Sequence, residues 1–122
     1  MKFYRLHIDS KNDLTLYEKI TKTLLVNPSA LNQEKNSKDF YSLWTYSFEE
    51  KDEEPNYNFI NQFLNIIEPK LSELNKIGIY KEDITFWMIY EYDQQCGMEF
   101  NPQEMKRLGE SGIVMCIDCY QK

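Results

Sequence analysis

The chain has 122 residues, which is enough for one domain with one hydrophobic core. Asp and Glu number 20 against 14 Lys and Arg, so the formal net charge is −6. An acidic domain disfavours nucleic acid and anionic membranes, and the charged partner that suits it best is a protein with a basic surface. The apolar runs fall well short of the roughly 20 residues of a transmembrane helix. We therefore predict a single domain, residues 1–122, that binds neither nucleic acid nor membrane.

The N-terminal segment and the cysteines indicate where such a protein resides. Residues 1–5 contain no apolar signal segment. The chain has three cysteines, an odd number that fits reduced thiols better than a set of disulfides. Together these two features predict a cytoplasmic protein.

A strand and a helix are predicted first along the chain. Residues 2–9 alternate between apolar and polar side chains, which is typical of a strand with one buried face. The helix that follows begins either with a capping box of Thr15 and Glu18 or with Asp13 as its N-cap. It ends before Pro28. Its apolar stripe has a four-residue spacing and comprises Leu16, Ile20 and Leu24.

A second strand is predicted over residues 40–48, and an acidic run follows over residues 49–54. This run carries a net charge of −4. It is interpreted either as an ordinary solvated loop or as a loop that steers a basic partner electrostatically. The acidic side chains of this electrostatic loop are Glu49, Glu50, Asp52, Glu53 and Glu54.

The longest predicted helix begins near Asn56 and closes at Gly78. Pro69 lies inside it, and a proline within a helix removes one hydrogen bond and bends the axis. The apolar stripe nevertheless keeps its phase across Pro69, so we predict two helical arms that meet at a bend and both face the sheet. The stripe comprises Ile60, Leu64, Ile67, Leu71 and Leu74.

Residues 84–92 are the most hydrophobic and most strand-like run, and we predict that they form a central strand. The run is short and has no N-cap residue, which disfavours a helix. Alternation places on the buried face Ile84, Phe86, Met88, Tyr90 and Tyr92. The opposite face, apolar in its middle and acidic at its end, carries Thr85, Trp87, Ile89, Glu91 and Asp93.

The C-terminal part is predicted to contain a short hairpin strand, a helix and a last strand. The hairpin strand covers residues 98–100. The helix begins at Asn101, an N-cap residue followed by proline, and turns Met105 and Leu108 inward. The last strand covers residues 113–120. Its predicted core face comprises Ile113, Met115, Ile117 and Cys119.

The predicted order of elements is therefore β-α-β-α-β-(β)-α-β. A few amphipathic helices pack most economically as one layer on a sheet. We predict an α+β fold, with a four- to five-stranded sheet and three helices mainly on one face. A mostly parallel, doubly wound sheet is the alternative, because strands and helices alternate along the chain.

The sheet face that the helices leave uncovered is the candidate partner-binding site. Mixed charge around a tryptophan and a tyrosine is typical of an interface core with a polar rim. The alternative interpretation is a plain solvated sheet face. The side chains predicted on this outer face are Arg5, His7, Thr45, Trp87, Ile89, Glu91, Asp118 and Tyr120.

Catalytic and metal sites have little support in the sequence. Cys116 and Cys119 form a C-x-x-C pattern, but inside a strand this odd spacing sends the two thiols to opposite faces. His7 is the single histidine, so acid–base catalysis would have to pair it with Glu91 or Asp118. Glycine-rich phosphate loops and the hydrolase and metalloprotease motifs are absent from the sequence. We expect no catalytic residue, no metal and no cofactor.

Several stretches resemble the bacterial family catalogued as domain of unknown function 4279. Residues 18–29 are similar to its early helix, with an Ile-Thr pair and a Pro-Ser exit, and residues 43–47 to its tryptophan-bearing strand. Residues 90–92, 100–105 and 117–120 resemble its closing strand, helix and Asp-x-Tyr strand. The resemblance implies a single α+β domain of bacterial origin, and it implies no activity.

Three hypotheses about function follow. The first is a non-enzymatic bacterial protein-binding domain, in its most concrete form an immunity-type protein that neutralises a basic toxin domain. It is motivated by the small size, the acidity and the nine tyrosines. The second is a small ligand-binding or enzymatic domain that uses the outer sheet face. The third is a homo-oligomer whose outer faces stack and bury Trp87.

Overall fold

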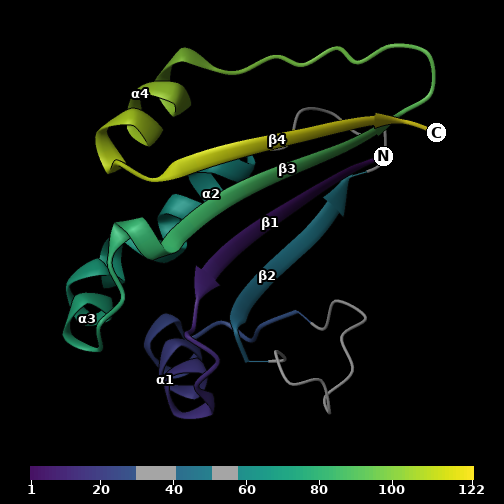
Figure 1. Cartoon of the computed structure of the whole chain (residues 1–122). Coiled ribbons are helices and arrows are strands. Elements are labelled where there is room, and N and C mark those ends of the chain that lie inside the picture. Colours follow the sequence, from purple (N-terminus) through teal and green to yellow (C-terminus); the bar gives the residue numbers. More distant parts are fainter. Residues whose placement is uncertain (30–40, 51–57) are drawn as a thin grey trace.

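The computed structural model describes residues 1–29, 41–50 and 58–122 (Figure 1). The strands of these residues are β1 (Lys2–Asp9), β2 (Leu43–Glu50), β3 (Ile84–Tyr92) and β4 (Val114–Gln121). The α-helices are α1 (Leu14–Leu24), α2 (Phe59–Ile67), α3 (Leu71–Lys76) and α4 (Pro102–Ser111). Two short 3-10 helices, η1 (Glu68–Lys70) and η2 (Lys81–Asp83), precede α3 and β3.

The strands of the described residues form one mixed sheet in the order β2-β1-β3-β4. β1 pairs antiparallel with both β2 and β3, whereas β3 pairs parallel with β4. β3 is therefore an interior strand, which confirms the prediction for residues 84–92. Because one of the three pairings is parallel, the alternative of a mostly parallel, doubly wound sheet is wrong.

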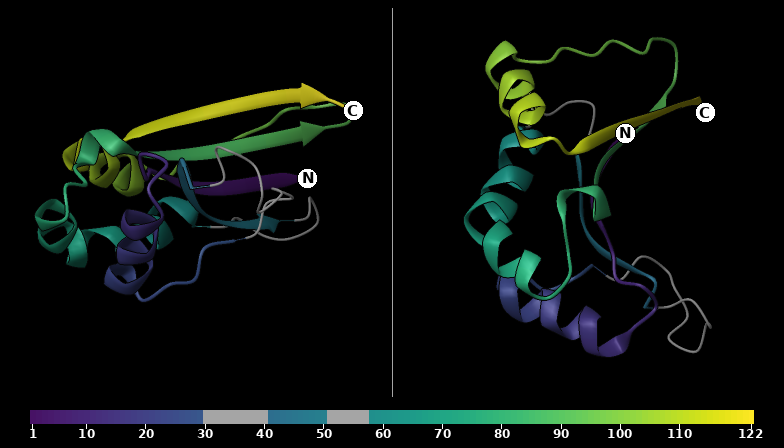
Figure 2. Two further views of the ribbon diagram at one scale, coloured as in Figure 1. Left: turned by 60° about the horizontal axis from the view of Figure 1, so that its bottom comes forward. Right: turned by 60° about the vertical axis from the view of Figure 1, so that its left-hand side comes forward.

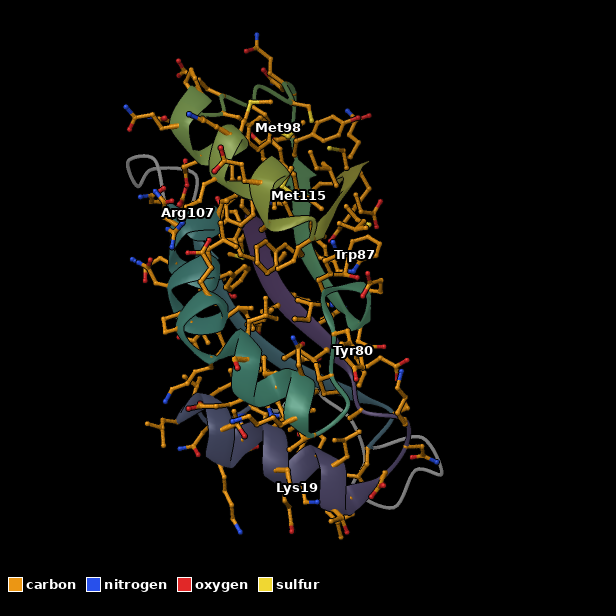
Figure 3. The ribbon with its side chains drawn as sticks, turned by 90° about the vertical axis from the view of Figure 1, so that its left-hand side faces the viewer. Lys19, Tyr80, Trp87, Met98, Arg107 and Met115 are labelled. Atoms are coloured by element: carbon orange, nitrogen blue, oxygen red, sulfur yellow. The ribbon has the colours of Figure 1, made fainter. Side chains whose placement is uncertain are left out.

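The helices lie on one face of the sheet, which we call the inner face. Figure 2 shows this layer from two directions. In Figure 3, Arg107 of α4 points to the side of the helices, and Trp87 of β3 points to the opposite side, which we call the outer face. The predicted α+β fold with helices mainly on one face is confirmed.

The core between the layers is rich in aromatic rings. Phe63 of α2 is fully buried, and its ring centroid lies 5.2 Å from that of Phe86 and 5.4 Å from that of Phe48. Burial of a side chain of this size contributes about 1.5 to 3 kcal/mol. Near α1, the indole nitrogen of Trp44 donates to Thr21 Oγ1 at 3.0 Å, so the buried ring keeps its polar atom satisfied.

The bend at Pro69 is present. α2 ends at Ile67, η1 contains Pro69, and α3 continues from Leu71. A 3-10 turn tolerates the proline because its missing N–H falls at the start of a helical segment. Of the predicted stripe, Leu71 is partly buried, and the fully buried members are Ile60, Leu64, Ile67 and Leu74.

The N-cap of α4 is the predicted one, and for α1 the structure shows which of the two predicted caps is used. Asn101 caps α4, and its side chain accepts a hydrogen bond from the backbone of Gln103 at 2.8 Å. For α1, the cap is Asp13 rather than the box of Thr15 and Glu18, because its Oδ1 accepts from the backbone of Thr15 at 2.9 Å. The predicted start of the long helix at residue 56 lies outside the described residues.

The C-terminal part departs from the predictions at three points. Residues 98–100 form no strand, and the sheet of the described residues has four strands. Met105 is 56% exposed instead of facing inward, and the predicted core residues Ile117 and Cys119 of β4 are exposed. The reason is that α4 has no fully buried residue. Of the predicted core face, Ile113, just before β4, is buried and Met115 is partly buried, whereas the side chains further along β4 keep the alternation without cover from the described residues.

Arg107 fastens α4 to α2 and η1. Its guanidinium donates to Asn61 Oδ1 at 3.0 Å and to Asn65 Oδ1 at 2.8 Å, both on α2. It also donates to both carboxylate oxygens of Glu68, at 2.9 and 3.3 Å. Several hydrogen bonds therefore hold a helix that has little apolar burial of its own.

Candidate functional site

The register of the sheet brings the predicted outer-face residues onto one surface. Arg5 lies opposite Trp87 across β1 and β3, and His7 lies opposite Thr45 across β1 and β2. The pairing of β3 with β4 places two further pairs on the same face, Ile89 opposite Asp118 and Glu91 opposite Tyr120. Because side chains alternate along a strand, the eight predicted residues share one side.

Trp87 stands near the middle of this face. It is half-buried, and its ring centroid lies 6.2 Å from that of His7. Arg5, opposite Trp87 on β1, is also half-buried. Thr45 is 4% exposed, so the prediction that its side chain is displayed on the surface is wrong. The centre of the outer face is thus a tryptophan among polar side chains that are only partly hydrated.

His7 is held in its neutral form. Burial and, to a smaller extent, the positive charge of Arg5 together lower its pKa from 6.5 to about 4. Burial disfavours the charged imidazolium, and a neighbouring cation does the same. A histidine with such a pKa is a weak general base at neutral pH. Its protonation state therefore gives no support to acid–base chemistry at this position.

The register also separates His7 from the carboxylates that acid–base catalysis would need. His7 pairs with Thr85, whereas Glu91 lies six residues further along β3. At about 3.3 Å per residue this is roughly 20 Å. Asp118, opposite Ile89, is also distant from His7 along the strand direction. The predicted residues therefore share a face without forming one catalytic centre.

A second polar group occupies the far end of the face. Tyr120 Oη donates to Glu91 Oε2 at 2.9 Å, and Lys122 Nζ lies 3.8 Å from Glu91 Oε1. The hydrogen bond to Glu91 and the nearby Asp118 raise the pKa of the Tyr120 phenol. Asp118 and Tyr120 are exposed. This end is acidic, and Glu91 within it is partly buried.

The first two residues of the acidic run belong to a strand and not to the predicted loop. Glu49 and Glu50 are the last residues of β2 and do not belong to a loop. Glu49 is exposed on the outer face, opposite Phe3, whereas Glu50 faces inward, opposite Lys2, and is 2% exposed. The prediction that Glu50 is a solvated loop residue is therefore wrong. The remaining members of the electrostatic loop, Asp52, Glu53 and Glu54, lie outside the described residues.

The cysteines of β4 point to opposite faces, as predicted. Cys116 lies opposite Trp87 on the outer face, and Cys119 lies opposite Tyr90 on the inner face. A hydrogen bond with Cys96 raises the pKa of the Cys119 thiol. Among the described residues, no group of three or more His, Cys, Asp or Glu side chains is arranged to hold a metal ion.

An apolar groove between α4 and β4 was not foreseen. It has a volume of about 470 Å³, and its lining includes Leu108, Met105, Met115 and Ile117. The spacing of Met105 and Leu108 is the sequence signal for this groove, because it places both apolar side chains on one face of α4. Within the described parts of the chain, the groove is open on the side away from the core.

The comparisons with known proteins assign the chain to a family. A family model described as "Domain of unknown function (DUF4279)" matches residues 6–122, and the chain belongs to this family. Neither the curated proteins nor the solved structures include a match to the chain. None of the helices in the described ranges has the length and apolar character that crossing a membrane requires.

Proposed function

We propose that the chain is a non-enzymatic protein-binding domain that uses the outer face of its sheet as the contact surface. The observation that carries this proposal is the position of Trp87 on a face that has no helical cover among the described residues. Tryptophan, tyrosine and arginine are the residue types that most often dominate binding energy at protein interfaces.

The arrangement of side chains supports this proposal. Trp87 and Arg5 lie side by side at the centre, where a partner would exclude water. The polar rim contains the exposed Asp118 and Tyr120 and the partly buried Glu91. A centre of tryptophan and arginine within a polar rim is a common organisation of a protein interface.

We propose that the partner carries a basic surface. The net charge of the chain is −6, and the acidic side chains Glu49, Glu91 and Asp118 lie on the outer face. Opposite charge accelerates association and favours the correct partner. The most concrete form of the proposal is a bacterial, cytoplasmic immunity-type protein that neutralises a basic toxin domain.

Site-specific photo-crosslinking in the organism that encodes the chain tests the proposal. A photoreactive amino acid at position 87 is expected to capture a basic protein. The same amino acid at Lys19, which is exposed on α1 at the lower end of the molecule in Figure 3 and away from Trp87, is the matched control. The captured protein is then purified and its affinity for the chain is measured with and without Trp87→Ala. We expect at least a tenfold loss, the effect of about 1.4 kcal/mol.

The same experiment distinguishes the other hypotheses. Capture of a second copy of this chain at position 87, with a doubled mass in light scattering, would establish the homo-oligomer instead. Equal capture of many proteins at both positions would contradict a specific contact surface. The hypothesis of a ligand or enzyme site on the outer face predicts no protein captured at position 87.

A further inference from the structure

We propose that the chain binds a small organic primary amine, through its ammonium group, in a pocket beside Glu50 on the inner side of the sheet. The pocket lies between the end of β2, the start of β1 and residues 97–100, and has a volume of about 370 Å³. This is within the range of about 300 to 1,000 Å³ that is typical of small-molecule sites. The proposal does not depend on the outer face.

The central observation is a buried carboxylate oxygen that no described residue satisfies. Glu50 is 2% exposed and lines the pocket, and its Oε2 has no hydrogen-bond partner among residues 1–29, 41–50 and 58–122. The other oxygen, Oε1, lies 3.8 Å from Lys2 Nζ, which is an ion pair longer than a direct hydrogen bond. A buried acceptor without a donor is costly, and a ligand that donates to Oε2 would remove this cost.

The charge of the lining favours a cation over an anion. The charged residues that line the pocket are Lys2, Glu50 and Glu99, so carboxylates exceed ammonium groups. Lys2 also lies over the ring of Tyr90, with Nζ 5.0 Å from the centroid, and this contact holds the lysine at the edge of the site. The unsatisfied atom is an acceptor, so an ammonium is the complementary group.

The remaining walls suit an apolar chain attached to that ammonium. Tyr4 and Phe59 stack with a centroid distance of 4.5 Å and form one wall. Met88 and Met98 contribute flexible thioether side chains, which adapt to ligands of different shape. The walls and the carboxylate together define an aliphatic primary amine of a few carbons as the ligand class.

NMR of the full chain with ¹³C-methyl methionine and n-pentylammonium as the probe tests this inference. Met88 and Met98 line the pocket, whereas Met105 and Met115 line the separate groove at α4. We expect saturable shifts of the Met88 and Met98 methyl signals, with Met105 and Met115 unchanged. The neutral n-pentanol and the anionic pentanoate are expected to bind at least about tenfold more weakly.

Glu50→Gln and Glu49→Gln form a matched pair, because both remove one charge from neighbouring positions of β2. We expect Glu50→Gln to weaken pentylammonium binding at least about tenfold, whereas Glu49→Gln, on the exposed outer face, leaves it unchanged. Should Glu50→Gln not fold, Lys2→Met replaces it. Removal of the competing ammonium is then expected to preserve or strengthen binding, and a loss of binding would overturn the proposal.

Three further outcomes would overturn it. One is the absence of saturable shifts at Met88 and Met98. Another is equal binding of pentanol, which would mean that the apolar walls alone attract the probe. The third is shifts confined to Met105 and Met115, which would place binding in the groove at α4.

Discussion

The two faces of this sheet are made from the same strands and differ in what covers them. On β3, Phe86 points inward and is fully buried beneath α2, whereas its neighbour Trp87 points outward and is half-buried. The inner face is stabilised by close packing of apolar side chains. On the outer face, the buried polar atoms Arg5 Nε, His7 Nε2 and Thr45 Oγ1 have no hydrogen-bond partner among the described residues, so this face is not packed like the core.

The two faces also place the last two carboxylates of β2 in different surroundings. Glu49 is exposed on the outer face and contributes to the acidic surface, whereas Glu50 is buried on the inner face beside Lys2. Identical chemistry at adjacent positions therefore has two consequences. On one face the charge is screened by water, and on the other it requires a partner.

The largest change in the free energy of unfolding is expected from substitutions at the neighbouring aromatic residues of β3, Phe86 and Trp87. Phe86→Ala should lower the free energy of unfolding by about 3 to 5 kcal/mol, because it leaves a cavity in the core. Trp87→Ala should cost less than half as much, because the indole is half-buried and none of the described helices packs on it. Urea denaturation followed by circular dichroism measures both values. Equal losses would mean that the outer face is part of the core.

Protonation of His7 is expected to make the stability of the chain depend on pH. Its pKa is about 4 in the folded chain and 6.5 when unfolded, so the unfolded state binds more protons between these values. Stability is therefore full above pH 6.5 and falls as the pH is lowered toward 4. After a discount for the partial exposure of the ring, we expect a loss of about 1 to 2 kcal/mol.

His7→Gln should remove this part of the pH dependence. Because His7 is the single histidine, its ring proton signal can be titrated by NMR without overlap from another histidine. A measured pKa near 6.5 in the folded chain would show that this part of the outer face is hydrated like an ordinary surface.

A smaller effect is expected at Thr45. Its hydroxyl oxygen is buried and has no hydrogen-bond partner in the described part of the chain, so Thr45→Val removes an unsatisfied polar group while keeping the β-branched shape. We expect the free energy of unfolding to rise by about 1 kcal/mol. Thr85→Val, at a more exposed position of the same face, is the matched control and should change stability less. Destabilisation by Thr45→Val would indicate that the hydroxyl makes a hydrogen bond to water.

The smallest effect is expected at the exposed end of the outer face. Tyr120→Phe removes the hydrogen bond to Glu91, but both groups are accessible to water that can replace it. The midpoint of urea denaturation should therefore remain within experimental error of the unsubstituted chain. A clear loss of stability would show that this end is structural, whereas unchanged stability with a weaker partner affinity would support its place in the interface rim.

Much of the fold could be predicted because local patterns agreed with the tertiary arrangement. The alternation of residues 84–92, the N-cap at Asn101 and the unbroken stripe across Pro69 each correspond to an element that forms. The predictions failed at Met105, Ile117 and Cys119, which have the right spacing for burial but are not covered by the described residues. They also failed at residues 98–100, which form no strand although Phe100 packs against the core. A pattern indicates which side chains are able to be buried, and only the packing decides whether they are.

The sequence by itself determined the strands, the helices and the face on which each side chain lies, because these depend on spacing along one segment. That the outer-face residues of different strands share one side of the sheet was predicted from the sequence, but the register of the strands decided it. The tertiary structure alone decided that His7 is far from Glu91, that Glu50 lies beside Lys2 in a pocket, and that Cys96 meets Cys119. These relations join segments distant in the chain, and the register and packing that create them are not written in any local pattern.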